Sequence, residues 1–224
     1  MLIGNDVVDL GDDEAGLSNL HPRFVERVFA KEERGRIFSS PNPKVSLWTY
    51  WAAKESAYKI MKKVEGEVVF APSTWVVELE SEHGCGRLRG SVSDGRRLFD
   101  LEMMRTGEWI HALATLRSVP SEVVGILSDV ERCPTCRDPS MAVRTLAVRA
   151  LSEGLGFAAE TLSIDRSKPP RVVGPVQARG VDLSLSHHGR WISFAATLPG
   201  EGLPRAAASV HDPARQIDTS IKRK

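Results

Sequence analysis

Hydrophobic and polar positions along the chain predict alternating blocks of strand and helix. Residues 2–10 (LIGNDVVDL) are mostly apolar and rich in valine and isoleucine, which is typical of a buried strand. Apolar residues at helical spacing predict helices at 22–38 and 46–63, the second with Ser46 as its N-cap. A Pro-Asn-Pro loop at 41–43 separates them. The first block therefore runs from strand to helix.

The middle of the chain changes from helical to β periodicity and back. Short β-rich runs with glycine-containing turns between them fill 67–118 and predict an antiparallel meander. The periodicity fades over 119–140, and a new helix is predicted from about Met141 to Gly154 or Gly156. Two strand-like stretches follow, TLSIDRSKPPRVV and VDLSLSHHGRWISFAATL.

This order of blocks predicts an α+β fold built from two similar αβ halves. We place the first half at 1–120, a linker at 121–140 and the second half at 141–198. Residues 199–224 are rich in Pro, Gly, Ala and charge, so they bury too little apolar surface to order themselves. We expect this tail to be disordered.

Composition narrows the classes of partner. The 30 Lys and Arg nearly cancel the 29 Asp and Glu, so the net charge of +1 gives no overall field for nucleic acid or an anionic membrane. An acidic residue, Asp6, comes too early for a secretory signal, and no apolar run approaches the roughly 18 residues of a membrane span. We therefore expect a cytoplasmic protein that binds neither nucleic acid nor membrane.

The cysteines agree with a reducing compartment. Cys85, Cys133 and Cys136 are too few and odd in number for a disulfide framework. The spacing Cys133-Pro-Thr-Cys136 suggests a zinc or redox site, but zinc needs two more ligands and a redox motif needs a βαβ setting. We expect a pair of free thiols in the linker.

Three charged residues are candidates for chemistry. Asp6 interrupts an apolar strand, and a buried carboxylate needs a partner. Glu55 and Lys59 share one stripe of the predicted helix. By themselves they are better explained as a surface pair worth about 0.2–0.5 kcal/mol, because such pairs are common. Asp6 by itself could also cap a turn or pair with a buried arginine, a role that better suits Asp9 on the opposite face.

Two segments together carry a family resemblance. IGNDVVDL at the start and WAAKESAYK at 51–59 resemble the paired signature of the 4′-phosphopantetheinyl transferase superfamily, a Gly-x-Asp strand followed by Trp-x-x-Lys-Glu-Ser-x-x-x-Lys on a helix. RVFAKEER resembles the helix between them. AVRTLAVRAL, SKPPRVV and LSLSHHGRW resemble blocks of the surfactin-type transferases, but with the two halves in exchanged order. The resemblance covers 1–198.

The resemblance implies a fold and a reaction. The fold is the 4′-phosphopantetheinyl transferase fold, with the two halves packed as a pseudo-dimer and coenzyme A (CoA) in the cleft between them. The reaction is the Mg²⁺-dependent transfer of the 4′-phosphopantetheine arm of CoA to a serine of an acyl or peptidyl carrier protein, as in the holo-acyl-carrier-protein synthases. Because both halves lie in one chain, we expect a monomer.

The resemblance also implies roles for the first-half residues. Asp6 and Glu55 would bind Mg²⁺, which takes one or two carboxylates together with substrate oxygens and water. The surfactin-type third ligand is replaced by Val8, so we expect a water there. Glu55 would be the general base, and Lys59 the cation that stabilises charge on the phosphate.

Most of the implied CoA contacts come from the second half. They are Ser186, His187, Lys168, Pro169, Arg144 and Thr145, with Lys54 from the first half. Alternatives remain open, because His187 could be a strand histidine bonded to backbone and Arg144 an exposed helix charge. Ser167 stands where the family usually has glycine, and we expect His188 to face solvent.

Two other interpretations compete with an active transferase. The departures at Val8 and Ser167 would suit a non-catalytic CoA-binding protein of the same fold, although the retained metal and base residues favour the enzyme. An unrelated interaction module with accidental motif matches would be favoured if Asp6 and His187 lay far apart.

Overall fold

The chain folds into two main β-sheets, each covered by one long helix. The computed structural model describes residues 1–21, 23–80, 86–117, 125–133, 135 and 137–198. In these residues a five-stranded antiparallel sheet has the order β1-β5-β4-β3-β2, and a three-stranded antiparallel sheet has the order β6-β10-β9.

The strands are β1 (Ile3–Asp9), β2 (Val76–Leu79), β3 (Arg87–Ser93), β4 (Leu98–Arg105), β5 (Trp109–Leu116), β6 (Gly125–Arg132), β9 (Asp182–His188) and β10 (Trp191–Leu198), with the short pair β7 (Ser163–Ile164) and β8 (Val172–Val173). The helices are α1 (Phe24–Val28), α2 (Lys31–Ser39), α3 (Pro43–Glu65) and α4 (Pro139–Leu155).

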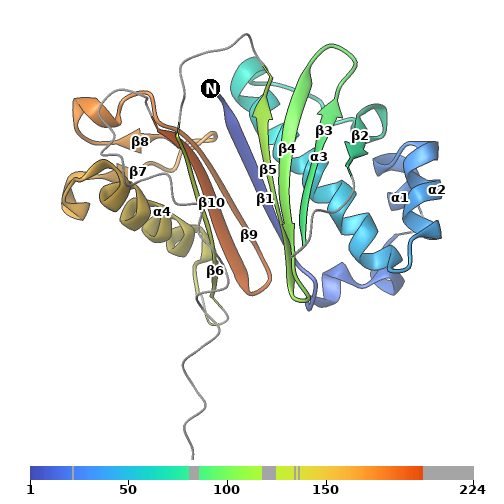
Figure 1. The fold of residues 1–224 in the computed structure, drawn as a ribbon. Coiled ribbons are helices and arrows are strands. Elements are labelled where there is room, and N and C mark those ends of the chain that lie inside the picture. The colour runs from blue at the N-terminus through green and yellow to red at the C-terminus, as the bar shows by residue number, and fades with distance from the viewer. Residues whose placement is uncertain (22, 81–85, 118–124, 134, 136, 199–224) are drawn as a thin grey trace, which may run out of the picture.

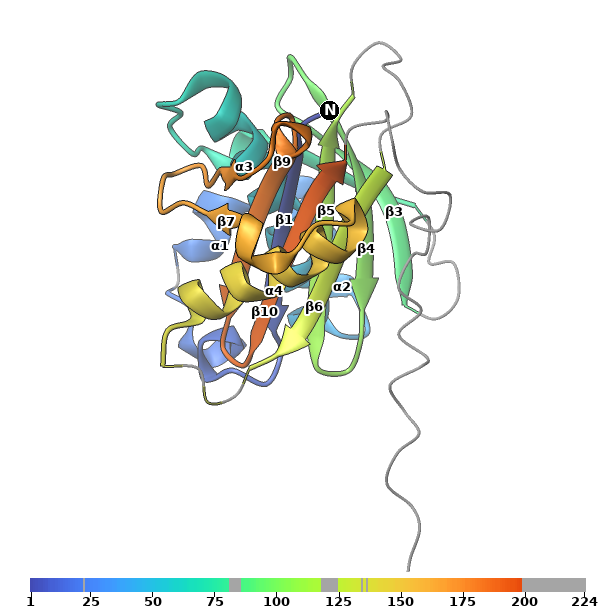
Figure 2. The ribbon, with the colours of Figure 1, turned by 90° about the vertical axis from the view of Figure 1, so that its left-hand side faces the viewer.

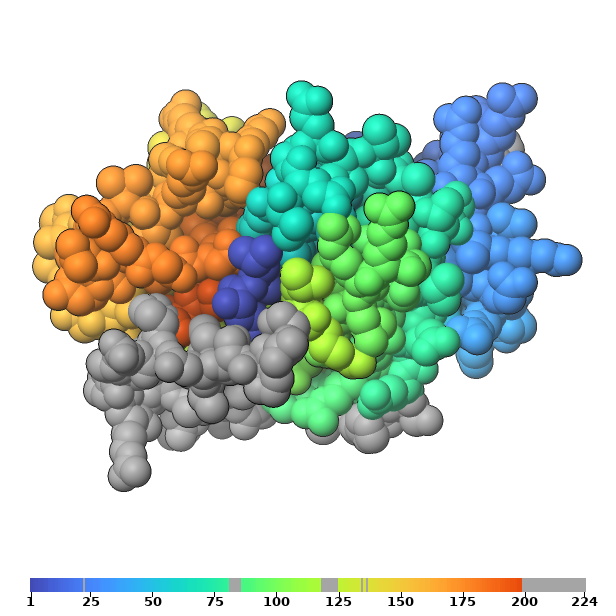
Figure 3. All heavy atoms as spheres, turned by 90° about the horizontal axis from the view of Figure 1, so that it is seen from above, coloured from blue at the N-terminus to red at the C-terminus, as the bar shows by residue number. Residues whose placement is uncertain are grey.

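The elements form a mixed α+β arrangement, as predicted. Helix α3 covers one side of the five-stranded sheet and α4 covers the outer side of the three-stranded sheet (Figures 1 and 2). Each helix and its sheet enclose a separate hydrophobic core. Strand β1 lies where the two units meet, and the view from above shows its N-terminal end between them (Figure 3). Whether the two units resemble one another as a pseudo-dimer stays a prediction.

Helix α3 begins earlier than predicted. The side chain of Asn42 accepts a hydrogen bond from the backbone N–H of Val45, and Pro43 occupies the first turn, where its missing N–H costs nothing. Asn42, and not Ser46, is therefore the N-cap. The helix ends at Gly66, whose φ of 68° suits glycine. The Pro-Asn-Pro segment thus starts the helix as well as ending the preceding one.

The single helix predicted at 22–38 is two helices, α1 and α2. Phe29 and Ala30 adopt extended backbone between them. Phe29 is fully buried in the first core, and the Glu33 carboxylate accepts a hydrogen bond from the Ala30 N–H at 2.9 Å. Side-chain burial and a new cap therefore overrode the continuous helical pattern.

The predicted linker at 121–140 contains a strand. Residues Gly125–Arg132 form β6, which pairs antiparallel with β10 and completes the second sheet. Its side chains are mostly half-buried or exposed, so its hydrophobic alternation is weak. Helix α4 follows, with Asp138 as N-cap and the left-handed Gly156 as its end, the second of the two predicted positions.

The two final strand-like stretches differ in outcome. The first forms only the two-residue strands β7 and β8, and the second forms the β9–β10 hairpin. Every residue of β10 is buried. The predicted disordered tail lies outside the described residues. Among the helices of the described residues, none has both the length and the apolar character to cross a membrane.

Among the described residues, the outer edge of β1 is bonded by side chains and not by another strand. Backbone N–H groups at every second residue of β1 donate to side chains at every second residue of β9. The bonds join Ile3 to Asp182 (2.7 Å), Asn5 to Ser184 (2.9 Å), Val7 to Ser186 (3.3 Å) and Asp9 to His188 (3.1 Å). On the same edge, Lys63 and Lys59 of α3 donate to the carbonyls of Ile3 (2.6 Å) and Asn5 (2.7 Å). We call this set the β1 edge ladder. It satisfies backbone groups that burial would otherwise leave unpaired.

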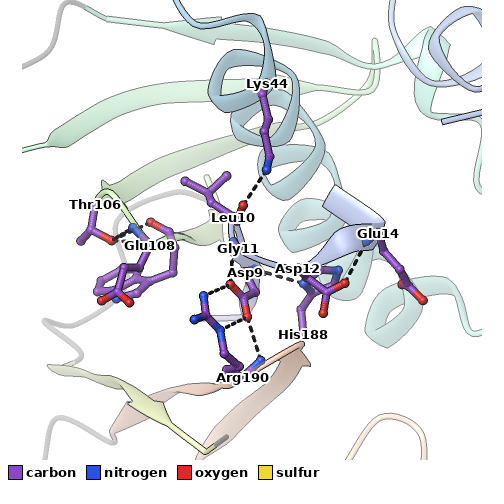
Figure 4. A network of polar contacts seen from close by, with 11 residues as sticks. Asp9, Leu10, Gly11, Asp12, Glu14, Lys44, Thr106, Glu108, His188 and Arg190 are labelled. Carbon is purple, nitrogen blue, oxygen red and sulfur yellow. Dashed lines mark hydrogen bonds and ion pairs between the residues drawn. The ribbon is translucent and has the colours of Figure 1, made fainter. Parts of the chain in front are cut away.

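Asp9 anchors the far end of β1. Its buried carboxylate accepts two side-chain bonds and one backbone bond from Arg190, and another from the backbone of Gly11 (Figure 4). Burial raises the pKa of Asp9, but the bonds from Arg190 and Gly11 outweigh it and hold this pKa far below its usual range. A side chain at Gly189 would clash with Asp9 and Asp12. Asp9 therefore has the arginine-pairing role expected of it.

Candidate functional site

The candidate site forms around Asp6, where β1, α3 and β9 meet. Asp6 lies in β1 on the side that faces α3, and its side chain is 12% exposed. One carboxylate oxygen, Oδ1, accepts hydrogen bonds from Ser186 Oγ at 2.8 Å and from Lys59 Nζ at 3.0 Å. Among the described residues, the other oxygen, Oδ2, has no hydrogen bond. The partner of this interior carboxylate is thus a lysine from α3 and a serine from β9.

Glu55 lies one helical turn before Lys59 on α3. It is half-buried, and its carboxylate makes no hydrogen bond or ion pair with the described residues. Burial raises the pKa of Glu55, and the charge of Asp6 raises it further, while Lys59 and Lys62 lower it, so the net value is about 7. Two carboxylates therefore repel each other here, and one has no partner to offset its burial.

These residues fit a magnesium ion. Oδ2 of Asp6 and both oxygens of Glu55 are free among the described residues, and a divalent cation would relieve their repulsion. The described residues hold no cluster of three or more His, Cys, Asp or Glu side chains. Val8 is buried in the first core and offers no third ligand. Such a set of donors suits Mg²⁺, which keeps water and substrate oxygens in its coordination shell.

Lys59 is held by three oxygens. Besides Asp6, its ammonium donates to the carbonyl of Asn5 at 2.7 Å and approaches that of Leu185 on β9 at 3.5 Å. The ammonium group therefore links α3 with both β1 and β9. Its charge stays beside the carboxylate pair, within reach of a group bound there.

His187 lies at the end of β9, next to Ser186 but on the opposite face of the strand. It is exposed, and partial burial of its ring, Lys59 and His188 lower its pKa, whereas Asp138 and Asp6 raise it. These charges place His187 in electrostatic range of both the Asp6 site and the N-terminus of α4. Since the hydroxyl of the neighbouring Ser186 bonds Asp6 at 2.8 Å, the structure brings Asp6 and His187 into one region.

His188 is not solvent-facing as expected. It is half-buried, and its Nδ1 accepts the hydrogen bond of the Asp9 backbone in the β1 edge ladder. Its ring centroid lies 6.4 Å from that of Trp48. Period two along β9 makes this placement necessary, because His188 continues the row of side chains that faces β1.

The Lys168–Pro169 segment forms a tight exposed loop with a cis peptide bond. Asp165 Oδ1 accepts hydrogen bonds from the backbone and hydroxyl of Ser167 and from the backbone of Arg171. The Ser167 hydroxyl also approaches the carbonyl oxygen of Pro169 at 2.6 Å. The serine at the position where the family has glycine therefore helps to fix the loop.

Arg144 supports this loop from α4. Its Nε donates to the Asp165 carbonyl at 3.1 Å, and its Nη1 donates to the carbonyl and hydroxyl oxygens of Ser140. Thr145 is exposed, and its hydroxyl donates to the carbonyl of Met141 one turn earlier. The N-terminal turns of α4 and the 165–171 loop are thus adjacent, as a shared phosphate or adenine site would need.

Lys54 lies outside the site. Its side chain is fully buried and donates to Glu33 Oε2 at 2.6 Å and to the carbonyls of Val28 and Pro72. All three ammonium hydrogens are therefore used, and none is free for a phosphate. Lys54 joins α3 to the loops around α1 and β2, so the expected CoA contact does not fit this structure.

The cysteines also differ from expectation. Cys133 follows β6 and is disulfide-bonded, whereas free thiols were expected. Cys85 and Cys136 lie outside the described residues, so the expected Cys133–Cys136 thiol pair is described at one position only.

Sequence reasoning missed the other members of the β1 edge ladder. Asp182 and Ser184 precede Ser186 at period two, with Leu183 and Leu185 between them. This alternation signals a strand with one polar face, and only its Ser-His end was recognised. Lys63 continues the Glu55–Lys59 stripe by one further turn, and its ammonium bonds Asp182 at 2.8 Å.

Comparison with known proteins finds a family model that is similar to the first part of the chain. Residues 2–81 match the family model described as the 4′-phosphopantetheinyl transferase superfamily. This segment is similar to that superfamily. The match includes the β1 strand with Asp6 and the α3 helix with Glu55 and Lys59, and it confirms the resemblance drawn from the two motifs. Residues from 82 onward, which include β9 and α4, lie outside the match.

A search of curated proteins gives a distant relative. The chain is 30% identical over 104 residues to the fatty acid synthase alpha subunit pigJ of Monascus ruber. The aligned part is 43% of this chain but only 6% of that subunit. The similarity therefore covers less than half of this chain and a small portion of that subunit.

Proposed function

We propose that this protein transfers the 4′-phosphopantetheine arm of CoA to a serine of an acyl or peptidyl carrier protein in a Mg²⁺-dependent reaction in the cytoplasm. The observation that carries the proposal is the carboxylate pair of Asp6 and Glu55 beside Lys59, inside the segment that matches the transferase superfamily. A paired carboxylate site next to a lysine provides a metal site, a base and a cation together.

The proposed chemistry assigns a step to each group. Bound Mg²⁺ would supply charge neutralisation at the pyrophosphate of CoA, held by Asp6 and Glu55. The ionised Glu55 takes the proton of the carrier serine as its hydroxyl oxygen bonds to the phosphorus that bears the pantetheine arm. The bond from that phosphorus to the bridging oxygen breaks, and the adenosine bisphosphate leaves. Lys59 stabilises the negative charge that moves onto the phosphates.

The second sheet and α4 would bind the rest of CoA. His187 and Arg144, which lies in the first turns of α4, offer polar and charged contacts for phosphates. Lys168 is exposed on the loop that Arg144 supports. Pro169 and Thr145 complete the set of second-half residues proposed to surround the cofactor. The proposal places CoA across the end of β9, between the two units.

A surface hollow beside α3 supports docking of a carrier protein. Its volume is about 650 Å³, and its lining includes Trp51 of α3, one turn before Glu55, together with Phe70 and Arg27. Exposed charges on α1 and α2 are mostly basic, namely Arg23, Arg27, Lys31 and Arg36 against Glu26 and Glu32. An acidic helical carrier could place an apolar side chain in this hollow while its serine reaches Glu55.

The decisive experiment is intact-protein mass spectrometry of a panel of apo carrier proteins incubated with the enzyme, CoA and Mg²⁺. The expected result is a carrier that gains the mass of the arm, with no gain when Mg²⁺ is chelated or the acceptor serine is replaced by alanine. CoA binding by calorimetry without modification of any carrier would instead identify a non-catalytic CoA-binding protein.

A further inference from the structure

We propose that Ser186 is a positioning residue that holds the metal-binding carboxylate of Asp6, and not a ligand of CoA. The inference rests on the proposed Mg²⁺-dependent transfer and names a residue that sets the geometry of the same site. It is carried by the two hydrogen bonds of one hydroxyl, which donates to Asp6 Oδ1 at 2.8 Å and accepts from the Val7 backbone at 3.3 Å.

These bonds leave the hydroxyl with little capacity for a phosphate. A serine hydroxyl has one proton to donate, and Ser186 gives it to Asp6. A phosphate oxygen is an acceptor and needs that same proton. Ser186 is also buried, on the face of β9 that points toward β1, whereas the exposed His187 lies on the other face. A contact between CoA and the Ser186 hydroxyl would therefore break its bond to Asp6.

The same bonds decide which oxygen of Asp6 receives a cation. Oδ1 accepts from both Ser186 and Lys59, so its lone pairs are used and the carboxylate cannot rotate freely. Oδ2 is left for the metal, on the side chain whose charge acts on Glu55. Partners of this kind, which orient a metal ligand without touching the metal, typically change metal affinity or activity by about 10–100-fold when removed.

The β9 strand contains a matched control two residues earlier. Ser184 is also buried and faces β1, and its hydroxyl accepts the Asn5 backbone N–H at 2.9 Å. It has the same place in the β1 edge ladder as Ser186 but contacts no carboxylate among the described residues. Ser184→Ala therefore removes one rung of the ladder and leaves Asp6 intact, whereas Ser186→Ala removes both a rung and the support of Asp6.

The test measures metal binding without turnover. Mn²⁺, which accepts the same oxygen ligands as Mg²⁺, is titrated into each variant and free Mn²⁺ is followed by electron paramagnetic resonance, with and without CoA and always without carrier protein. We expect Ser186→Ala to weaken Mn²⁺ binding by about 10–100-fold. Ser184→Ala should match the wild type, and Asp6→Ala should abolish binding at the site.

Conservative variants separate positioning from folding. Ser186→Thr keeps the hydroxyl, so it should retain wild-type Mn²⁺ affinity. Ser186→Cys keeps the volume of the side chain, but its thiol is a weak donor, so this variant should lose Mn²⁺ affinity. It replaces Ser186→Ala in the test if the alanine variant does not fold. Melting temperatures of all variants are measured in parallel. A loss that follows the hydroxyl and not the melting temperature supports positioning.

Two results would overturn the inference. Ser186→Ala could bind Mn²⁺ as tightly as Ser184→Ala, which would make the hydroxyl a strand cap only. Alternatively it could lose CoA affinity with no change in metal affinity, which would make it a phosphate contact. Failure of the proposed transfer itself appears separately, as wild-type protein that binds Mn²⁺ but modifies no carrier.

Discussion

At the scale of single residues, the site depends on which carboxylate oxygens are left free. Asp6 has one oxygen bound by Lys59 and Ser186 and one free, and Glu55 has no partner among the described residues. A carboxylate without a partner in a half-buried position costs free energy unless a cation or a proton joins it. The site is therefore destabilising in the metal-free protein and suited to a metal ion.

Replacement of Glu55, the proposed base, tests whether its carboxylate is needed for turnover. Glu55→Gln keeps the size of the side chain but removes the base and one metal charge, so we expect turnover to fall at least about 10²-fold. CoA affinity should fall less, because the second-half contacts remain. Single-turnover kinetics with a saturating carrier protein measure the change, with the exposed Glu67→Gln as control. A Glu55→Gln enzyme that works at the wild-type rate would show that the base is another group.

The same substitution should stabilise the metal-free protein. The pKa of Glu55 is raised from 4.5 to about 7, so the folded state binds this proton more tightly than the unfolded state. Its contribution to the free energy of unfolding therefore falls as pH rises from 4.5 to about 7 and stays low above that. Because glutamine has no proton to lose, the free energy of unfolding of Glu55→Gln does not fall in this way. At pH 8 it should be about 1 to 3 kcal/mol higher than that of the wild type.

Urea unfolding at pH 4.5 and pH 8 in chelator measures this difference. The gap between Glu55→Gln and the wild type should open with pH and should narrow when Mg²⁺ is added, since only the wild type has the ionised ligand. An equal gap at both pH values would contradict the raised pKa.

At the scale of elements, α3 presents three lysines to two different surroundings. Lys54 faces the interior beside α1 and α2, and Lys59 and Lys63 reach the carbonyls of β1. The spacing of Lys59 and Lys63 after Glu55 keeps them on one side of the helix. Lys54 is adjacent to Glu55 in sequence and therefore faces elsewhere.

Loss of Lys54 should affect stability and not cofactor binding. Lys54→Met leaves the Glu33 carboxylate buried without its cation, which should cost about 3–5 kcal/mol in the free energy of unfolding. The folded protein should bind CoA with unchanged affinity. Chemical denaturation and calorimetry at low temperature measure the two effects. A large loss of CoA affinity in a stable Lys54→Met protein would restore Lys54 to the CoA site.

The two histidines of β9 should separate binding from stability. His187 is exposed on the face toward α4, so His187→Ala should weaken CoA binding with little change in melting temperature. His188→Ala removes the acceptor of the Asp9 backbone bond and should cost about 1 kcal/mol of stability. It should leave CoA affinity closer to the wild type. Calorimetry measures the CoA affinity of both variants, and thermal unfolding measures their stability. Unchanged CoA affinity in His187→Ala would show that His187 is not part of the CoA site.

At the scale of the whole molecule, the site lies where two separately packed units meet. The first unit supplies Asp6, Glu55 and Lys59, and β9 of the second supplies Ser186. The β1 edge ladder joins the units through polar side chains. Its bonds therefore set the distance between the carboxylate pair and the residues of β9.

Because one chain supplies both units, no second subunit is needed to complete the site. We expect a monomer of 24.6 kDa by multi-angle light scattering, and no change of mass when CoA and Mg²⁺ are added. An obligate trimer would contradict the arrangement of two different halves within one chain.

The sequence by itself determined the α+β class, the strand at Asp6, the long helix with Glu55 and Lys59 and the meander, and it limited the end of α4 to Gly154 or Gly156. These features follow from local periodicity, capping and glycine conformation, which nearby residues encode. The paired motifs also identified the superfamily, because the order and spacing of several chemical groups are specific.

Only the tertiary structure decided which side chains meet. The break between α1 and α2 depends on the buried Phe29, and β6 depends on its pairing with β10. The role of Lys54 depends on Glu33, which is 21 positions away in the sequence. The role of Ser186 depends on β1, where Val7 is 179 positions away. The β1 edge ladder exists because a buried strand edge must have its N–H and C=O groups satisfied, and packing of the two units selected the side chains that do so.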